Sequence, residues 1–147
     1  MALFNSINTS GSGLSAEQLR MDVISNNIAN VNSTRTEAGG PYRRQKAVFM
    51  AKEPQFTIDL GPFVRSPVWR LGQGVRAVGI DTDDSPLRKE YQPNHPDADK
   101  DGYVLFPNVN IVVEMTDMIE ATRAYEANVT AMRSAKQMMM KSLEIGR

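Results

Sequence analysis

Apolar residues in the C-terminal third of the chain recur alternately four and three residues apart. The series has ten positions, eight of them apolar: Ile111, Met115, Met118, Thr122, Tyr125, Val129, Met132, Lys136, Met139 and Leu143. Sustained over more than four heptads, this spacing is typical of a coiled-coil seam and not of an ordinary surface helix. It predicts one long helix from about Asn108 to about Ile145, with Asn108 or Asn110 as its N-cap.

The same spacing occurs near the N-terminus, with seven apolar residues at nine positions: Leu3, Ile7, Ser10, Leu14, Glu17, Met21, Ile24, Ile28 and Val31. It predicts a helical segment over residues 1–32. The Ser-Gly-Ser-Gly run at 10–13 interrupts the pattern, and Ser15 with Gln18 forms a capping box, so a lone helix should begin near Ser15. Four asparagines crowd its end: Asn26, Asn27, Asn30 and Asn32. Because asparagine is a poor helix former, this helix should need a packing partner.

The middle of the chain contains the helix breakers. All eight prolines lie between Pro41 and Pro107, and a proline inside a helix costs about 3 kcal/mol, so the helices must lie outside this window. Alternating apolar and polar residues predict a strand at 55–60. Residues 75–80 and 103–106 are further strand candidates, and an Asp-Asp-Ser-Pro sequence predicts a turn at 83–86.

Together these elements predict an α+β fold in three parts: an N-terminal helix at 1–32, a small β-rich or irregular central domain at 33–107, and a C-terminal coiled-coil helix at 108–147. The insert can return the chain, so the helices are expected to form an antiparallel coiled-coil pair. A helix over 108–145 would be about 57 Å long, whereas a compact chain of this length is roughly 40 Å across. The helix should therefore protrude, and other chains should cover part of its apolar surface.

A register follows if the polar exceptions Ser10 and Lys136 face each other. Facing residue numbers then sum to 146, which places Leu14 beside Met132. The many methionines in the C-terminal helix suit a surface that meets several non-identical neighbours, because thioether side chains adapt to imperfect gaps. We expect an assembly interface formed by Leu14, Met21, Ile24, Ile28, Val31, Met115, Met118, Tyr125, Val129, Met132, Met139 and Leu143.

Composition and charge exclude several classes of function. The chain has 17 basic and 17 acidic residues, so it has no basic excess with which to bind nucleic acid. The longest apolar stretch is five residues, far too short for membrane insertion as a helix. Cysteine is absent, which excludes disulfides, thiolate zinc sites and cysteine nucleophiles. No basic residue precedes Arg20, so no cleaved secretory signal is expected.

One segment imitates a metal site. Residues 97–102, Asp-Ala-Asp-Lys-Asp-Gly, match the first half of a calcium-binding loop. Loop position 12 is Asn108 instead of glutamate, and Pro93 and Pro96 occupy the place of the entering helix. We interpret the segment as an acidic turn, with a weak calcium-binding module as the alternative.

No other motif indicates a reaction. His95 is the single histidine and cannot supply both an acid and a base, and no nucleotide-binding or hydrolase motif occurs. We therefore expect no catalytic, cofactor-binding or metal-binding residue, no cofactor and no small-molecule substrate. A basic run of Arg43, Arg44 and Lys46 is interpreted as a solvated strand face, with contact to an acidic partner surface as the alternative.

The two ends of the chain resemble a known family. Residues 15–32, SAEQLRMDVISNNIANVN, resemble the N-terminal motif of bacterial flagellar rod and hook proteins, and residues 108–132, NVNIVVEMTDMIEATRAYEANVTAM, resemble their C-terminal motif. Residues 79–106 narrow the resemblance to the C-type proximal rod subunits of the flagellar basal body. The matching segments cover about half the chain.

The resemblance implies a structural protein and not an enzyme. Such a subunit would assemble through its terminal helices, with itself and other rod subunits, into the drive shaft that transmits torque from motor to hook. Its neighbours would include the inner-membrane ring with its export apparatus and the distal rod. It would be exported by the flagellar type III apparatus without signal cleavage and would reside in the basal body. A soluble coiled-coil adaptor is the other alternative.

Overall fold

The computed structural model describes residues 2–37, 39–52 and 73–145, which form two long helices and four short strands. Their order is α1 (Ala2–Ala29), β1 (Gln45–Ala51), β2 (Val75–Thr82), β3 (Arg88–Tyr91), β4 (Tyr103–Phe106) and α2 (Ile111–Ile145). The α+β prediction is confirmed, as are both helices and the strands predicted at 75–80 and 103–106. The strand predicted at 55–60 lies outside the described residues. β3 was not predicted, and β1 was anticipated only by the strand face assigned to Arg43, Arg44 and Lys46.

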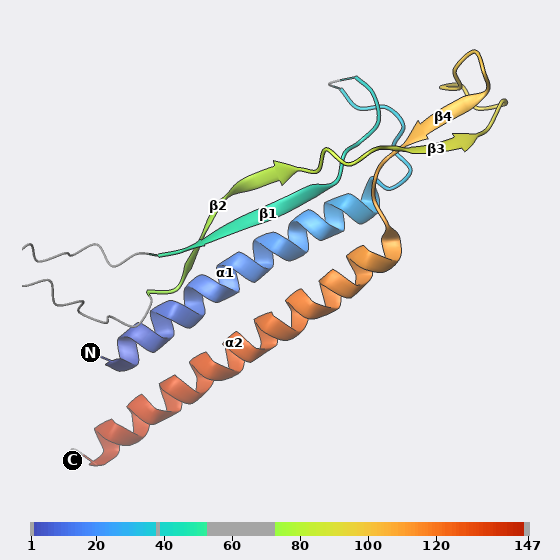
Figure 1. Cartoon of the computed structure of the whole chain (residues 1–147). Coiled ribbons are helices and arrows are strands. Elements are labelled where there is room, and N and C mark those ends of the chain that lie inside the picture. Colours follow the sequence, from blue (N-terminus) through green and yellow to red (C-terminus); the bar gives the residue numbers. More distant parts are fainter. Residues whose placement is uncertain (1, 38, 53–72, 146–147) are drawn as a thin grey trace, which may run out of the picture.

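The elements form three layers with α1 in the middle (Figure 1). α2 lies along one side of α1 and runs in the opposite direction, and the ribbon of β1 and β2 lies along another side. Within the described part of the chain, α1 packs against α2, β1 and β2, whereas α2 packs against no element except α1. α2 is therefore an outer layer, covered along one side by its own chain.

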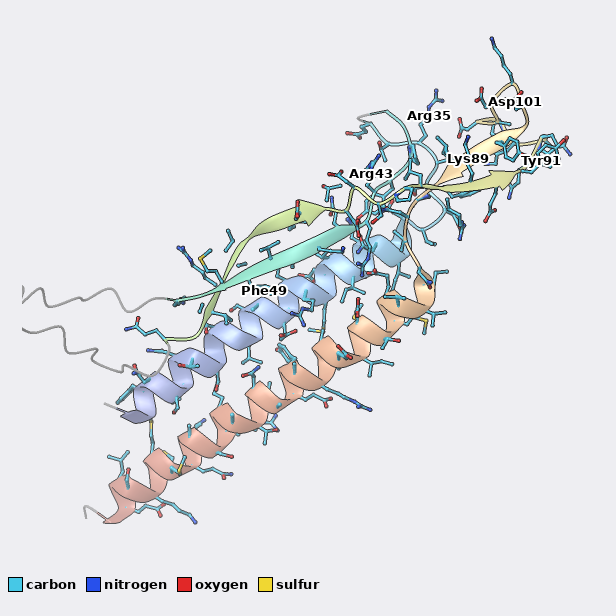
Figure 2. All side chains as sticks on the ribbon, in the orientation of Figure 1. Arg35, Arg43, Phe49, Lys89, Tyr91 and Asp101 are labelled. Atoms are coloured by element: carbon cyan, nitrogen blue, oxygen red, sulfur yellow. The ribbon has the colours of Figure 1, made fainter. Side chains whose placement is uncertain are left out.

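The strands form two separate antiparallel pairs. β1 pairs with β2 from Gln45 opposite Thr82 to Ala51 opposite Val75, with a bulge at residues 48 and 49. β3 and β4 form a hairpin that projects beyond the end of the helical pair; Figure 2 shows Lys89, Tyr91 and Asp101 on this projection. The asparagine cap predicted for α2 is confirmed, because Asn110 Oδ1 accepts hydrogen bonds from the backbone nitrogens of residues 112 and 113.

α1 is continuous through residues 10–13, whereas a beginning near Ser15 was expected only of a helix without a partner. The reason is packing on two sides. A Cβ on Gly13 would lie 3.0 Å from the Asn128 amide of α2, so the glycine permits close helix approach. On the side toward the ribbon, Ser12 Oγ accepts a hydrogen bond from Val75 N at 3.1 Å. Tertiary contacts thus outweigh the weak helix propensity of this segment.

Candidate assembly interface

The structure divides the expected interface residues into three groups by exposure. Ile24 and Val31 are buried within the chain. Eight others are half-buried: Leu14, Met21, Ile28, Met118, Tyr125, Val129, Met132 and Met139. Met115 and Leu143 are exposed, at 55% and 72%. Within the expected set, these two are the residues whose surface is mostly left uncovered.

The face of α2 that packs on α1 is not quite the expected seam. Every second seam position is replaced by the residue just before it in the sequence. Eight buried and half-buried residues on this face again alternate four and three apart: Glu114, Met118, Ala121, Tyr125, Asn128, Met132, Ala135 and Met139. Ala121 and Ala135 are small and Asn128 is polar, so a search for large apolar residues selected the neighbouring row. Asn128 in this row lies 3.0 Å from the position of a Cβ built on Gly13, so α1 approaches closely at this glycine.

The alignment of the two helices also differs from the expected one. Thr122 Oγ1 lies 3.7 Å from Met21 Sδ, and the residue numbers of this pair sum to 143. A Cβ on Gly11 would lie 3.7 Å from Met132 Cε, which gives the same sum. The expected sum was 146, with Leu14 beside Met132. The glycines, which the sequence pattern treats as an interruption, are among the contact positions in the structure.

The outer face of α2 carries large apolar side chains that are exposed. Near its beginning the exposed fractions are 73% for Val112, 55% for Met115 and 53% for Ile119. These positions are three and four residues apart, so they form one stripe on the helix. We call Val112, Met115 and Ile119 the outer stripe. Further exposed apolar residues lie beside it and near the other end of α2: Ile111, Val113, Met138, Met140 and Leu143.

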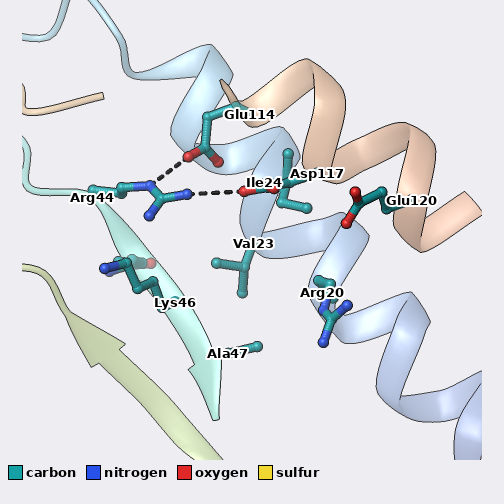
Figure 3. Close-up of a pocket in the computed structure, with 10 residues that line it drawn as sticks. Arg20, Val23, Ile24, Arg44, Lys46, Ala47, Glu114, Asp117 and Glu120 are labelled. Carbon is teal, nitrogen blue, oxygen red and sulfur yellow. Dashed lines mark hydrogen bonds and ion pairs between the residues drawn. The ribbon is translucent and has the colours of Figure 1, made fainter. Parts of the chain in front are cut away.

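Behind this surface, a buried polar cluster joins α1, β1 and α2. Figure 3 shows the part of it in which Arg44 contacts Glu114 and Asp117. We call Asn27, Arg44 and Glu114 the junction. The Glu114 side chain is 1% exposed, and its Oε1 accepts a hydrogen bond from Arg44 Nε at 2.5 Å. Its Oε2 accepts from Asn27 Nδ2 at 3.0 Å. Arg44 Nη2 also donates to Asp117 Oδ2 at 3.1 Å. The buried carboxylate is therefore paired with a cation and hydrogen-bonded on both oxygens.

Asn27 uses every hydrogen-bonding group of its amide. Nδ2 donates to Gln45 O at 2.9 Å as well as to Glu114, and Oδ1 accepts from Gln45 N at 3.0 Å and from the Tyr42 hydroxyl at 2.8 Å. Two donors and two acceptor sites are the full capacity of an asparagine side chain. Burial, together with the nearby Glu114 charge, raises the pKa of the Tyr42 hydroxyl, which keeps it a donor.

The basic run is only partly a solvated strand face. Arg43 and Lys46 are exposed, but the prediction is wrong for Arg44, whose side chain is 18% exposed. The acidic surface that Arg44 meets belongs to its own chain, in α2 and at Asp83. Its ion-pair partner Glu114 lies seventy positions along the sequence, so no local pattern could have revealed this contact.

The calcium-like segment forms the connection between β3 and β4. Asp97 Oδ2 accepts a hydrogen bond from Thr34, and Asp99 Oδ1 accepts from Lys100 N. Across residues 2–37, 39–52 and 73–145, no group of three acidic or histidine side chains is placed to hold a metal ion. His95 Nδ1 accepts from the backbone nitrogen of Asp97.

No helix in the same described ranges is long and apolar enough to cross a bilayer.

The sequence was compared with known families and proteins. Residues 7–35 match the family described as flagella basal body rod protein, and residues 100–145 match the family described as flagellar basal body rod FlgEFG protein C-terminal. These segments contain most of α1 and all of α2.

Full-length relatives agree with these matches. A protein of Borreliella burgdorferi named flagellar basal-body rod protein FlgC is 49% identical, with 99% of this chain and 98% of that protein covered. The protein of the same name from Bacillus subtilis is 44% identical over the whole of both chains. That of Salmonella typhimurium is 35% identical over 99% of each. Identity of this extent over full length shows that the chain belongs to the FlgC family of flagellar basal-body rod proteins.

Proposed function

We propose that this chain, a structural subunit of the flagellar basal-body rod, joins the rod by burying the outer stripe of α2 against other rod subunits. The observation that carries the proposal is that the rest of the chain covers α2 along one side only. Among the described helices and strands α2 packs on α1 alone, yet Val112, Met115 and Ile119 are each more than half exposed. Contiguous exposed apolar surface of this kind marks an interaction site in a folded protein.

The size of the effect favours cooperative assembly. Fully burying a valine, isoleucine or methionine side chain contributes about 1.5 to 3 kcal/mol, and these residues are roughly half exposed, so each would add about 1 kcal/mol. Three or four such residues give about 3 to 4 kcal/mol, which is weak for a single contact. A subunit that contacts several neighbours at once multiplies this contribution, as a tubular assembly requires.

The finer parts of the role rest on family membership and shape. We propose that the rod acts as a drive shaft, that the segments 1–32 and 108–147 form its inner wall, and that 33–107 lies outside. The inner-membrane ring with its export apparatus and the distal rod would be the neighbours, and export would proceed without signal cleavage. We further propose that the chain has no enzymatic activity. The junction supports torque transmission, because it ties β1 to both helices through hydrogen bonds to Asn27 and Glu114.

The location is tested by purifying basal bodies. A tagged copy of the chain should restore motility to a strain lacking it and should appear in detergent-extracted hook–basal bodies. His95→Ala should behave identically, because His95 lies in the β3–β4 connection, away from both helices. Recovery of a motility-restoring protein only in the soluble fraction would instead favour a coiled-coil adaptor.

A further inference from the structure

The face of α2 that packs on α1 repeats itself every seven residues. One row of this face contains Met118, Tyr125, Met132 and Met139, and the other contains Glu114, Ala121, Asn128 and Ala135. Methionine adapts to its surroundings and alanine is small, so apolar packing discriminates weakly between the observed alignment and one in which α2 has slipped by seven residues.

The junction breaks this repetition. Glu114 is the single charged residue in the two rows, and it is bonded to Asn27 of α1 and to Arg44 beside β1. A slip of seven residues would put Ala121 in the place of Glu114. Arg44 would lose its shortest ion pair, and the Asn27 amide would lose an acceptor in a buried site. Uncompensated buried polar groups of this kind strongly disfavour the slipped state.

We propose that the junction is a register lock, in which Asn27, Arg44 and Glu114 select one alignment of α1 and α2. A single buried polar residue can fix the register of paired helices in this way. The alignment in turn determines which part of α2 remains uncovered. The inference concerns the isolated subunit, so it is tested without the rod and can fail while the assembly role stands.

Engineered disulfides can measure the alignment, because the chain has no cysteine of its own. Met21→Cys with Thr122→Cys reports the observed alignment, since these side chains are in contact. Met21→Cys with Val129→Cys reports a slip of seven residues. With the junction intact, the first pair should oxidise about a hundredfold faster than the second.

The lock is then removed by combining Asn27→Leu, Arg44→Met and Glu114→Leu, which replaces the cluster with apolar side chains of similar size. Helicity by circular dichroism should be unchanged, while the preference for the first pair should fall to about threefold or less. Glu114→Gln should retain a preference of at least about tenfold, because it keeps an acceptor for Asn27 and Arg44. Glu126→Leu, an exposed position on α2, should have no effect.

Three results would overturn the proposal. The triple variant could keep the full preference for the observed pair, which would show that packing alone sets the alignment. It could lose its helicity, which would show that the junction serves folding and not the choice of alignment. The chain with its junction intact could oxidise both pairs equally, which would show that no alignment is selected.

Discussion

At the scale of single residues, the sequence indicates which side chains need a partner but not which partner they find. The asparagines at the end of α1 are poor helix formers, and the expectation that this helix needs packing is consistent with the four hydrogen bonds of Asn27. The partners lie 18 residues away at Gln45 and 87 residues away at Glu114. Contacts so distant depend on the whole topology, so local pattern cannot supply them. The same holds for Arg44.

Asp83, which lies near the junction, should make the stability of the fold depend on pH. Asp83 Oδ2 lies 2.6 Å from Lys46 Nζ, and its Oδ1 accepts a hydrogen bond from Ser85 N at 3.0 Å. The hydrogen bond from Lys46, followed by those from Ser85, holds the pKa of the Asp83 carboxyl well below its ordinary value. The ionised form is therefore favoured in the folded state. Its contribution to stability should be complete above about pH 4 and should be lost as the pH falls further.

Urea denaturation of the Asp83→Asn variant tests the direction of this pH dependence. The difference in unfolding free energy from the unaltered chain should be largest at neutral pH and should shrink between about pH 4 and pH 2. Asp84→Asn is the matched control, because the Asp84 side chain is 97% exposed and its pairing with Arg43 is loose. A difference for Asp83→Asn that stays constant over the whole range would contradict the assignment.

At the scale of elements, the predictions from long apolar repeats are confirmed for both helices. Both helices have long apolar repeats, and the strands at β2 and β4 were predicted. Beyond the strand face assigned to residues 43–46, β1 was not predicted, because its Val48 and Met50 are exposed while Ala47 and Phe49 face inward, so both faces are apolar and alternation is hidden. Phe49 lies under the Arg20 guanidinium, with 5.3 Å between the charge and the ring centre.

The docking of the ribbon on α1 depends on one glycine. Gly74 has a φ of +93°, and a Cβ placed there would lie 2.1 Å from Ser12 Oγ. Gly74→Ala should lower the free energy of unfolding by about 2 to 3 kcal/mol, since it adds left-handed strain and displaces the hydroxyl that accepts from Val75 N. Gly79→Ala, in β2 with no atom within 4 Å of the new Cβ, should change stability by less than about 0.5 kcal/mol. Equal effects of the two substitutions in urea denaturation would argue against this contact.

At the scale of the whole molecule, the sequence predicted that apolar surface would exceed what one chain can cover, and the exposed residues of α2 agree with this. The length of the helices and the family motifs were sufficient for that conclusion. The exact face was not predictable, because the position of the interhelical contact depends on glycine and alanine positions that carry no hydrophobic signal. The proposed assembly surface is therefore the outer stripe and not half-buried residues such as Met132.

The most direct test introduces a charge into that stripe. Ile119→Asp should leave the isolated subunit folded, with unchanged helicity and a urea midpoint close to that of the unaltered chain, because Ile119 is already 53% exposed. In cells the same variant should be absent from purified basal bodies and should not restore motility, because assembly would bury an unpaired carboxylate. Asn94→Asp, which adds the same charge in the β3–β4 connection, should assemble normally. Incorporation of folded Ile119→Asp at the level of the unaltered chain would show that the outer stripe is not the assembly surface.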